Sequence, residues 1–164
     1  MDLYPWLVLI HVLAAFGFAL SHGVSAFASF AIRREREPER IRVLLELSST
    51  AIGGLSASVL TLLVAGIAAG IMGNWFGRGW IWASLGILVL VAVAMYAMAS
   101  RYYGELRSAV GLAAYGDKKG EAPPPPVGPD QLAAILDTRR PEAIAAIGLG
   151  GLAVIVWLMV LKPF

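Results

Sequence analysis

The sequence has no cysteine among its 164 residues, and it has little charge. The lack of cysteine excludes disulfides, thiolate metal sites, iron–sulfur clusters and covalent C-x-x-C-H haem attachment. Charged residues make up 15% of the chain, whereas a soluble domain has about 25%. The basic residues flank apolar stretches and form no basic domain, so nucleic acid is not an expected partner.

Four long runs contain no Lys, Arg, Asp or Glu: residues 3–32, 48–72, 80–100 and 143–161. About 20 apolar residues in a helix cross the hydrocarbon core of a bilayer. The runs therefore predict a single all-α domain over residues 1–164, an integral membrane four-helix up-down bundle surrounded by the lipid bilayer. The first run has no preceding basic region and is longer than the apolar core of a signal peptide. We interpret it as a retained span.

Two charged connections and one short turn join these runs. The connection 33–47 contains Pro38, which disfavours helix at the preceding residue and predicts a break there. The rest of that connection is expected to form an amphipathic lead-in to the second span. The connection 101–140 holds a tract of four prolines, and Asp130 is the expected N-cap of a short helix that follows the tract. The glycine-rich turn 73–79 predicts an antiparallel pair formed by the second and third spans.

The basic residues predict the orientation. The first connection has five and the long connection six, while only Arg78 and Lys162 lie on the other side. By the positive-inside rule, both charged connections are expected in the cytoplasm, and the N- and C-termini outside the cell (inner) membrane.

Small residues recur every four positions in the second span, on two faces. One face carries Ser49, Gly53, Ala57, Thr61, Ala65 and Ala69; the other carries Thr50, Gly54, Ser58, Gly66 and Gly70. Such ridges let helix backbones approach closely in lipid. We therefore expect the second span to lie centrally, with one neighbour on each face.

The only two histidines, His11 and His22, both lie in the first span. Eleven residues at 100° each place them within about 20° of one face and roughly 16 Å apart along the helix axis, too far for one metal ion to bind both. Each histidine can hydrogen-bond to a serine or carbonyl of a neighbouring helix, or serve as an axial ligand of b-type haem. A second haem ligand would then be a methionine such as Met95 or Met98, a histidine of a dimer mate, or absent.

The segment WLVLIHVLAAFGF, residues 6–18, resembles the opening of small four-helix membrane proteins with an L-H-v-l-A-a signature. These are the copper-resistance D family, the haem-containing membrane protoporphyrinogen oxidases, and a related family of predicted integral membrane proteins of unknown function, which the chain resembles most. The resemblance implies that His11 is the haem iron ligand. Phe18 stands near the position where those families often have tryptophan, and the lysine of the oxidases has no counterpart in this chain.

Two functional hypotheses follow. In the first, haem b binds through His11, with His22 and Phe18 as further cofactor-binding residues and Ala15 leaving room beside the ring, and the protein acts in redox or metal handling. In the alternative, the chain is a non-catalytic accessory or scaffold subunit of a larger membrane complex, or a homodimer. No catalytic residue can be named, so whether the chain is an enzyme stays open.

Overall fold

A computed structural model describes residues 2–114, 117 and 122–164, and these residues form helices and connections without any strand. The long helices are α1 (Tyr4–Arg34), α2 (Pro38–Met72), α3 (Gly79–Ala109) and α5 (Arg140–Leu161); the short ones are η1 (Trp75–Gly77) and α4 (Pro129–Leu136). Four segments are long and apolar enough to cross a membrane, when α4 and α5 are counted together. The predicted fold class, an all-α membrane four-helix bundle, is confirmed.

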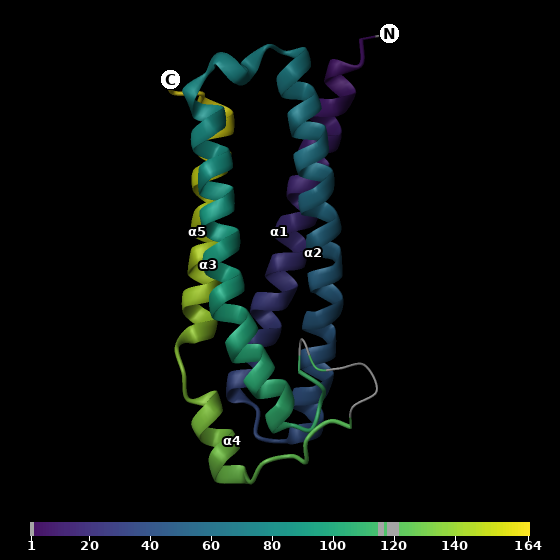
Figure 1. The fold of residues 1–164 in the computed structure, drawn as a ribbon, viewed down its shortest axis with the longest axis vertical. Helices are drawn as coiled ribbons and strands as arrows, with labels where there is room; N and C mark the ends of the chain where they lie inside the picture. The colour runs from purple at the N-terminus through teal and green to yellow at the C-terminus, as the bar shows by residue number, and fades with distance from the viewer. Residues whose placement is uncertain (1, 115–116, 118–121) are drawn as a thin grey trace.

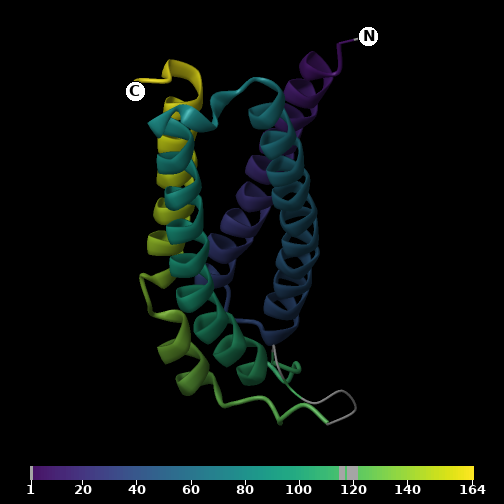
Figure 2. The ribbon, with the colours of Figure 1, turned by 45° about the horizontal axis from the view of Figure 1, so that its top comes forward.

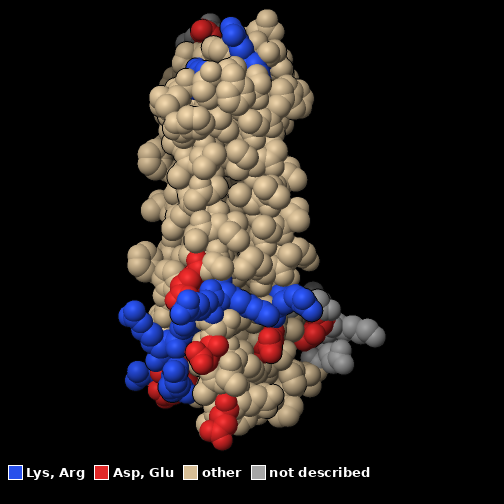
Figure 3. Space-filling model, turned by 90° about the vertical axis from the view of Figure 1, so that its left-hand side faces the viewer, with Lys and Arg blue, Asp and Glu red and all other residues tan. Residues whose placement is uncertain are grey.

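The helices run up and down between two ends of the molecule (Figure 1). Both termini and η1 lie at one end, which we call the terminal end. The break between α1 and α2, the end of α3, and α4 lie at the other, which we call the charged end. On the face shown in Figure 3, Lys and Arg form a band near the charged end, and a long uncharged surface separates this band from the terminal end.

The break between α1 and α2 follows from the proline, as expected. Glu37 precedes Pro38 and has an extended backbone, with φ −89° and ψ 116°. The carboxylate of Glu35 accepts hydrogen bonds from the backbone N–H groups of Arg36 and Glu37, at 2.8 and 3.1 Å. These N–H groups first, and the nearby charge of Arg40 second, hold the pKa of Glu35 below its ordinary value.

The N-terminus of α4 differs from the prediction. The N-cap residue is Gly128 and not Asp130, and no side chain caps the helix. Pro129 takes the first helical position, for which its fixed φ is suited, and this places Asp130 one position inside the helix. A carboxylate in the first turn still interacts favourably with the helix dipole.

The bundle consists of two helix pairs. α1 packs along α2, and α3 packs along α5, while a smaller contact between α1 and α5 joins the two pairs (Figures 1 and 2). The prediction that the second span lies centrally is therefore wrong, because α2 packs mainly on α1, and α1 is the one of these two helices that also packs on α5. One small-residue face of α2 packs on α1, whereas Gly53 on the other face has no atom within 4 Å of where a Cβ would lie. α2 and α3 are antiparallel, but each packs on another helix.

Small residues bring α1 and α2 together. A Cβ added to Gly54 would lie 2.9 Å from Oγ of Ser21, and one added to Gly17 would lie 2.7 Å from Oγ of Ser58. Nearer the charged end, the hydroxyls of Ser25 and Ser48 hydrogen-bond at 2.8 Å. Close backbone approach and polar contacts of this kind hold helices together where lipid is as apolar as the side chains.

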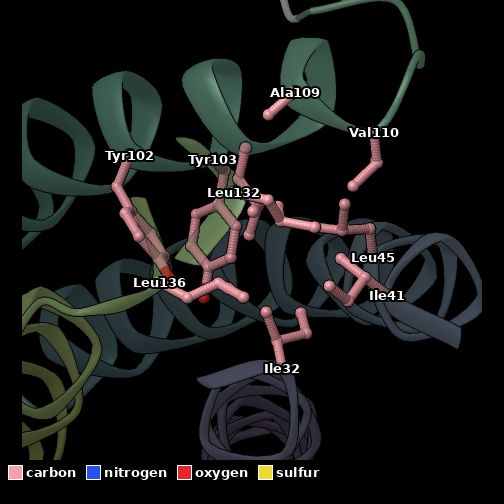
Figure 4. Close-up of a cluster of buried hydrophobic side chains, with 10 residues drawn as sticks. Ile32, Ile41, Leu45, Tyr102, Tyr103, Ala109, Val110, Leu132 and Leu136 are labelled. Atoms are coloured by element: carbon pink, nitrogen blue, oxygen red, sulfur yellow. The ribbon is translucent and has the colours of Figure 1, made fainter. Parts of the chain in front are cut away.

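A hydrophobic core closes the charged end (Figure 4). It joins α1, α2, α3 and α4 through ten buried residues: Ile32, Ile41, Leu45, Tyr102, Tyr103, Leu106, Ala109, Val110, Leu132 and Leu136. Polar contacts tie the same region. Arg33 of α1 pairs with Glu142 of α5, and Arg107 of α3 pairs with Glu46 of α2 at 3.3 Å. The two helix pairs are thus joined most extensively at the charged end.

Aromatic residues and the chain ends close the terminal end. The indole N–H of Trp75 donates to the hydroxyl of Tyr4 at 3.1 Å, which links η1 to α1. The ammonium of Lys162 lies over the ring of Trp75, 4.4 Å from its centroid, in a cation–π contact. The backbone N–H of Trp80 donates to the carbonyl of Phe164 at 3.3 Å, which ties the start of α3 to the C-terminal residue.

We expect Leu106→Ala to lower the free energy of unfolding by about 2–5 kcal/mol, because it leaves a cavity in the core of the charged end. Leu90→Ala is the matched control in the same helix: Leu90 is 69% exposed, whereas Leu106 is 0% exposed. The free energy of unfolding of both variants is measured by chemical denaturation in mild detergent, with the helical circular dichroism signal as the readout. Equal destabilisation by the two substitutions would show that this core is not the stabilising region.

Candidate functional site

His11 hydrogen-bonds across the interface between α1 and α2. Its Nδ1 lies 2.8 Å from the carbonyl oxygen of Leu62, and the side chain is half-buried. Gly66, one turn further along α2, makes room for the ring: a Cβ there would lie 2.7 Å from Nδ1 and 2.8 Å from Cε1 of His11. A carbonyl has two lone pairs, so that of Leu62 can accept this bond as well as the bond within its own helix.

This contact fixes the proton on the His11 ring. A carbonyl oxygen can only accept, so Nδ1 must be the protonated donor, and in the neutral ring Nε2 then carries a lone pair. Histidines that bind metals commonly donate their other N–H to a carbonyl in this way, which sets the tautomer and the ring orientation. The geometry therefore leaves Nε2 of His11 as a free nitrogen ligand.

His22 lies in a different environment, at the junction of α1, α3 and α5. Its side chain is 3% exposed, and its ring stacks on that of Phe18 with centroids 6.0 Å apart and planes 11° apart. A Cβ added to Gly148 of α5 would collide with Nε2 and Cε1 of His22 and would lie 3.1 Å from Sδ of Met95 of α3. Among the described residues, nothing hydrogen-bonds to the buried Nε2.

The two histidines thus contact different helices, although an ideal helix places them nearly on one face. α1 is inclined to the other long helices (Figure 2). His11 contacts α2, and His22, further along the same helix, contacts α5. Phe18 lies with His22 and not with His11. Met95, considered in the sequence as a second haem ligand, also lies beside His22.

Three residues of this region were not found from the sequence: Leu62, Gly66 and Gly148. Leu62 contributes only a backbone carbonyl, which leaves no mark in a sequence. Gly66 lies in one of the small-residue ridges, so its close contact was indicated, although its partner was not. Gly148 is one of three glycines in the fourth apolar run, and no signal distinguishes it from Gly150, around which a Cβ would meet nothing within 4 Å.

The described part of the chain has no group of three or more His, Asp or Glu that could hold a metal ion. Two surface recesses, of about 430 and 260 Å³, lie at the charged end. Both are lined by Arg33, one with Asp137 and the other with Glu142, and neither includes a histidine.

The two histidines differ in what they can bind. The donor chemistry of His11 fits haem iron, because Nδ1 is held by a carbonyl and Nε2 is left as the ligand atom. Haem does not fit at His22: its Nε2 lies directly against Gly148, and its ring is enclosed by Phe18, so a macrocycle would have to separate α1 from α5. The fit to haem thus favours His11 alone.

We expect Gly66→Ala to weaken the packing of α1 on α2, because the new methyl group displaces the His11 ring from the Leu62 carbonyl. The loss of such a bond in an apolar site costs about 1–3 kcal/mol. Gly53→Ala is the matched control, since its methyl group meets nothing and the gain in helix propensity is the same. Unfolding in detergent measures the difference. Similar stability of the two variants would contradict a close contact at Gly66.

Comparison with known proteins yields no match: no family model, no curated protein and no solved structure matches this chain. The functional argument therefore depends on the side-chain chemistry of α1 and its neighbours.

Proposed function

We propose that this multi-pass membrane protein binds b-type haem through His11 and acts in redox or metal handling. The observation that carries the proposal is the hydrogen bond from Nδ1 of His11 to the Leu62 carbonyl, which leaves Nε2 as a ligand atom. The resemblance of residues 6–18 to haem-containing membrane proteins supports the same residue. Haem b would supply one-electron redox chemistry at this position.

The residues around His11 define the proposed site. Gly66 and the Leu62 carbonyl hold the imidazole, and Ala15, one turn along α1, is small enough to leave room beside it. Phe18 and Met95 lie with His22, so neither would accompany His11 at this site. The opposite axial position would be open or filled from a second copy of the chain. The proposal includes no catalytic step.

The proposed location is the cell inner membrane, with the charged end in the cytoplasm. The structure brings the described residues of both charged connections to one end of the molecule and the ends of the described chain to the other (Figure 1). The basic residues thus gather on one side of the uncharged surface (Figure 3), as the positive-inside rule requires of a cytoplasmic side.

Single cysteines test this orientation, because the chain has none of its own. We expect a membrane-impermeant maleimide to label Gly77→Cys on intact cells, and to label Asp117→Cys only after the cells are permeabilised. Position 77 lies in η1 at the terminal end, and position 117 lies in the connection at the charged end. The reverse pattern would place the charged end outside.

An absorption spectrum of the purified protein tests haem binding. We expect a Soret band in the wild-type protein, and its loss in His11→Ala and in His11→Gln. Glutamine can still donate a hydrogen bond to the Leu62 carbonyl but cannot replace imidazole as the iron ligand, so it separates ligation from packing. His22→Ala is the control and should keep the band, because haem does not fit at His22.

Two results would contradict the haem proposal: a wild-type protein without haem after expression with added haem precursor, or an unchanged Soret band in His11→Gln. The alternative would then lead, in which the chain is an accessory subunit of a larger membrane complex. The observation that favours the alternative is the exposed face of α2, where Gly53, Ala57 and Thr61 contact no other helix closely. Small residues on a span usually mark helix contacts.

A further inference from the structure

We propose that the charged end has a binding site for the headgroup of one anionic phospholipid, formed where the end of α1 meets α4 and the start of α5. The ligand is a glycerophospholipid whose phosphodiester charge is not balanced by an ammonium group, as in phosphatidylglycerol. The site depends neither on haem at His11 nor on the side of the membrane at which the charged end lies.

The first observation is a pair of recesses that share one arginine. Arg33 lines both of them. The larger, of about 430 Å³, lies against α4 and also has Arg36 and Asp137 in its lining, and the smaller, of about 260 Å³, has Arg34 and Glu142. The larger volume falls within the roughly 300–1,000 Å³ that is usual for small-ligand sites.

The second observation is that arginines next to these recesses are not neutralised by carboxylates. Arg34, Arg139 and Arg140 form no ion pair within the part of the chain that the structure describes. At the same end of the molecule, Arg40 and Arg42 of α2 each pair with a glutamate at 2.9 Å. The positive-inside rule accounts for basic residues at this end, but not for their lack of partners at one place on it.

The charge balance at this place is positive. Residues 33–36 and 137–142 together contain five arginines and three acidic residues, which leaves a net charge of +2. Two of the acids already have partners, since Glu142 pairs with Arg33 and Glu35 pairs with Arg40. A guanidinium has five N–H donors, so Arg33 can keep Glu142 and still donate to a phosphate. Arginine also binds phosphate oxygens in a bidentate manner.

The apolar surface beside the arginines favours a lipid over a free phosphate. Arg34 follows directly on the uncharged residues 3–32, and Phe30 lines the smaller recess. Phe27 and Leu20 precede Arg34 at intervals of seven residues, on the same face of α1, and they are 76% and 71% exposed. A headgroup at Arg34 would thus have apolar surface along α1 for its acyl chains. Basic pockets between membrane helices bind anionic headgroups in this way.

The experiment uses the full chain in a non-ionic detergent and counts bound lipids by native mass spectrometry, with dioleoyl phosphatidylglycerol and dioleoyl phosphatidylcholine added in separate titrations. We expect one phosphatidylglycerol to bind at least tenfold more tightly than phosphatidylcholine. The double variant Arg34→Gln/Arg140→Gln should weaken phosphatidylglycerol binding at least tenfold, because each arginine near an anionic lipid contributes about fivefold. Arg40→Gln is the matched control and should keep the preference, since Arg40 already pairs with Glu37.

Glu142→Gln gives an independent test, because it removes a negative charge from the smaller recess and frees Arg33. We expect phosphatidylglycerol to bind about fivefold more tightly, a gain that partial unfolding cannot produce. Glu39→Gln removes the same charge from the start of α2 and should leave the affinity unchanged. Equal affinity of the wild-type protein for the two lipids, an unchanged preference in the double variant, or no gain in Glu142→Gln would overturn the proposal.

Competition separates a lipid from a free phosphate. Inorganic phosphate and glycerophosphoglycerol, which is the headgroup without acyl chains, are added to the protein with phosphatidylglycerol bound. We expect neither to displace the lipid at a large molar excess, because neither contacts the apolar surface of α1. Displacement by either compound would show that the site takes a soluble phosphate, and the assignment to a lipid would then be wrong. The Soret band reports on His11 separately.

Discussion

The structure depends on one constraint: within lipid, the hydrophobic effect does not favour contacts between apolar side chains of different helices, because the lipid tails are equally apolar. Helices in the span therefore associate through close backbone approach and hydrogen bonds. The interface of α1 with α2 uses both, with glycines facing serines and with the His11–Leu62 bond. An imidazole buried in hydrocarbon without a hydrogen-bond partner raises the free energy of the folded state. Gly66 leaves the space in which the His11 ring reaches the Leu62 carbonyl, so this contact also helps to set how α2 packs against α1.

At the charged end, unlike in the span, burial of apolar side chains stabilises the structure. The buried cluster that includes Leu106 and Leu136 lies at the end of the molecule where the charges gather, within reach of water. There the hydrophobic effect acts as it does in a soluble protein, and burying one large aliphatic side chain stabilises by about 1.5–3 kcal/mol. The pair Arg33–Glu142 joins α1 to α5 in the same region. Much of the contact between the two helix pairs thus lies at this end of the molecule.

The sequence was sufficient for the fold class but not for the helix neighbours. Runs without charge predict spans directly, because a charged group in hydrocarbon is expensive, and a proline breaks a helix wherever it lies. A small-residue face shows only that a helix could approach: both faces of α2 carry the pattern, yet α1 covers one and no helix closely covers Gly53. Asp130 had the chemistry of an N-cap, but Pro129 moved the start of α4 by its own preference for the first position.

For the histidines, too, the sequence did not predict which helix or which atom each ring contacts. Spacing placed His11 and His22 on one face of α1, but the inclination of α1 turns that face toward α2 at one depth and toward α5 at another. Helical periodicity describes directions around one axis, and it carries no information about where a neighbouring axis crosses. A carbonyl partner such as Leu62, or a close contact such as that of His22 with Gly148, arises only once the helices are placed.

The surroundings of His11 and His22 differ, although both are imidazoles on the same helix. His11 is half-buried and oriented through Nδ1, so in the neutral ring its Nε2 keeps a lone pair. His22 is buried, with its ring stacked on Phe18 and in close contact with Gly148. The imidazole is the same at both positions, so what distinguishes the two histidines is the set of residues around each ring.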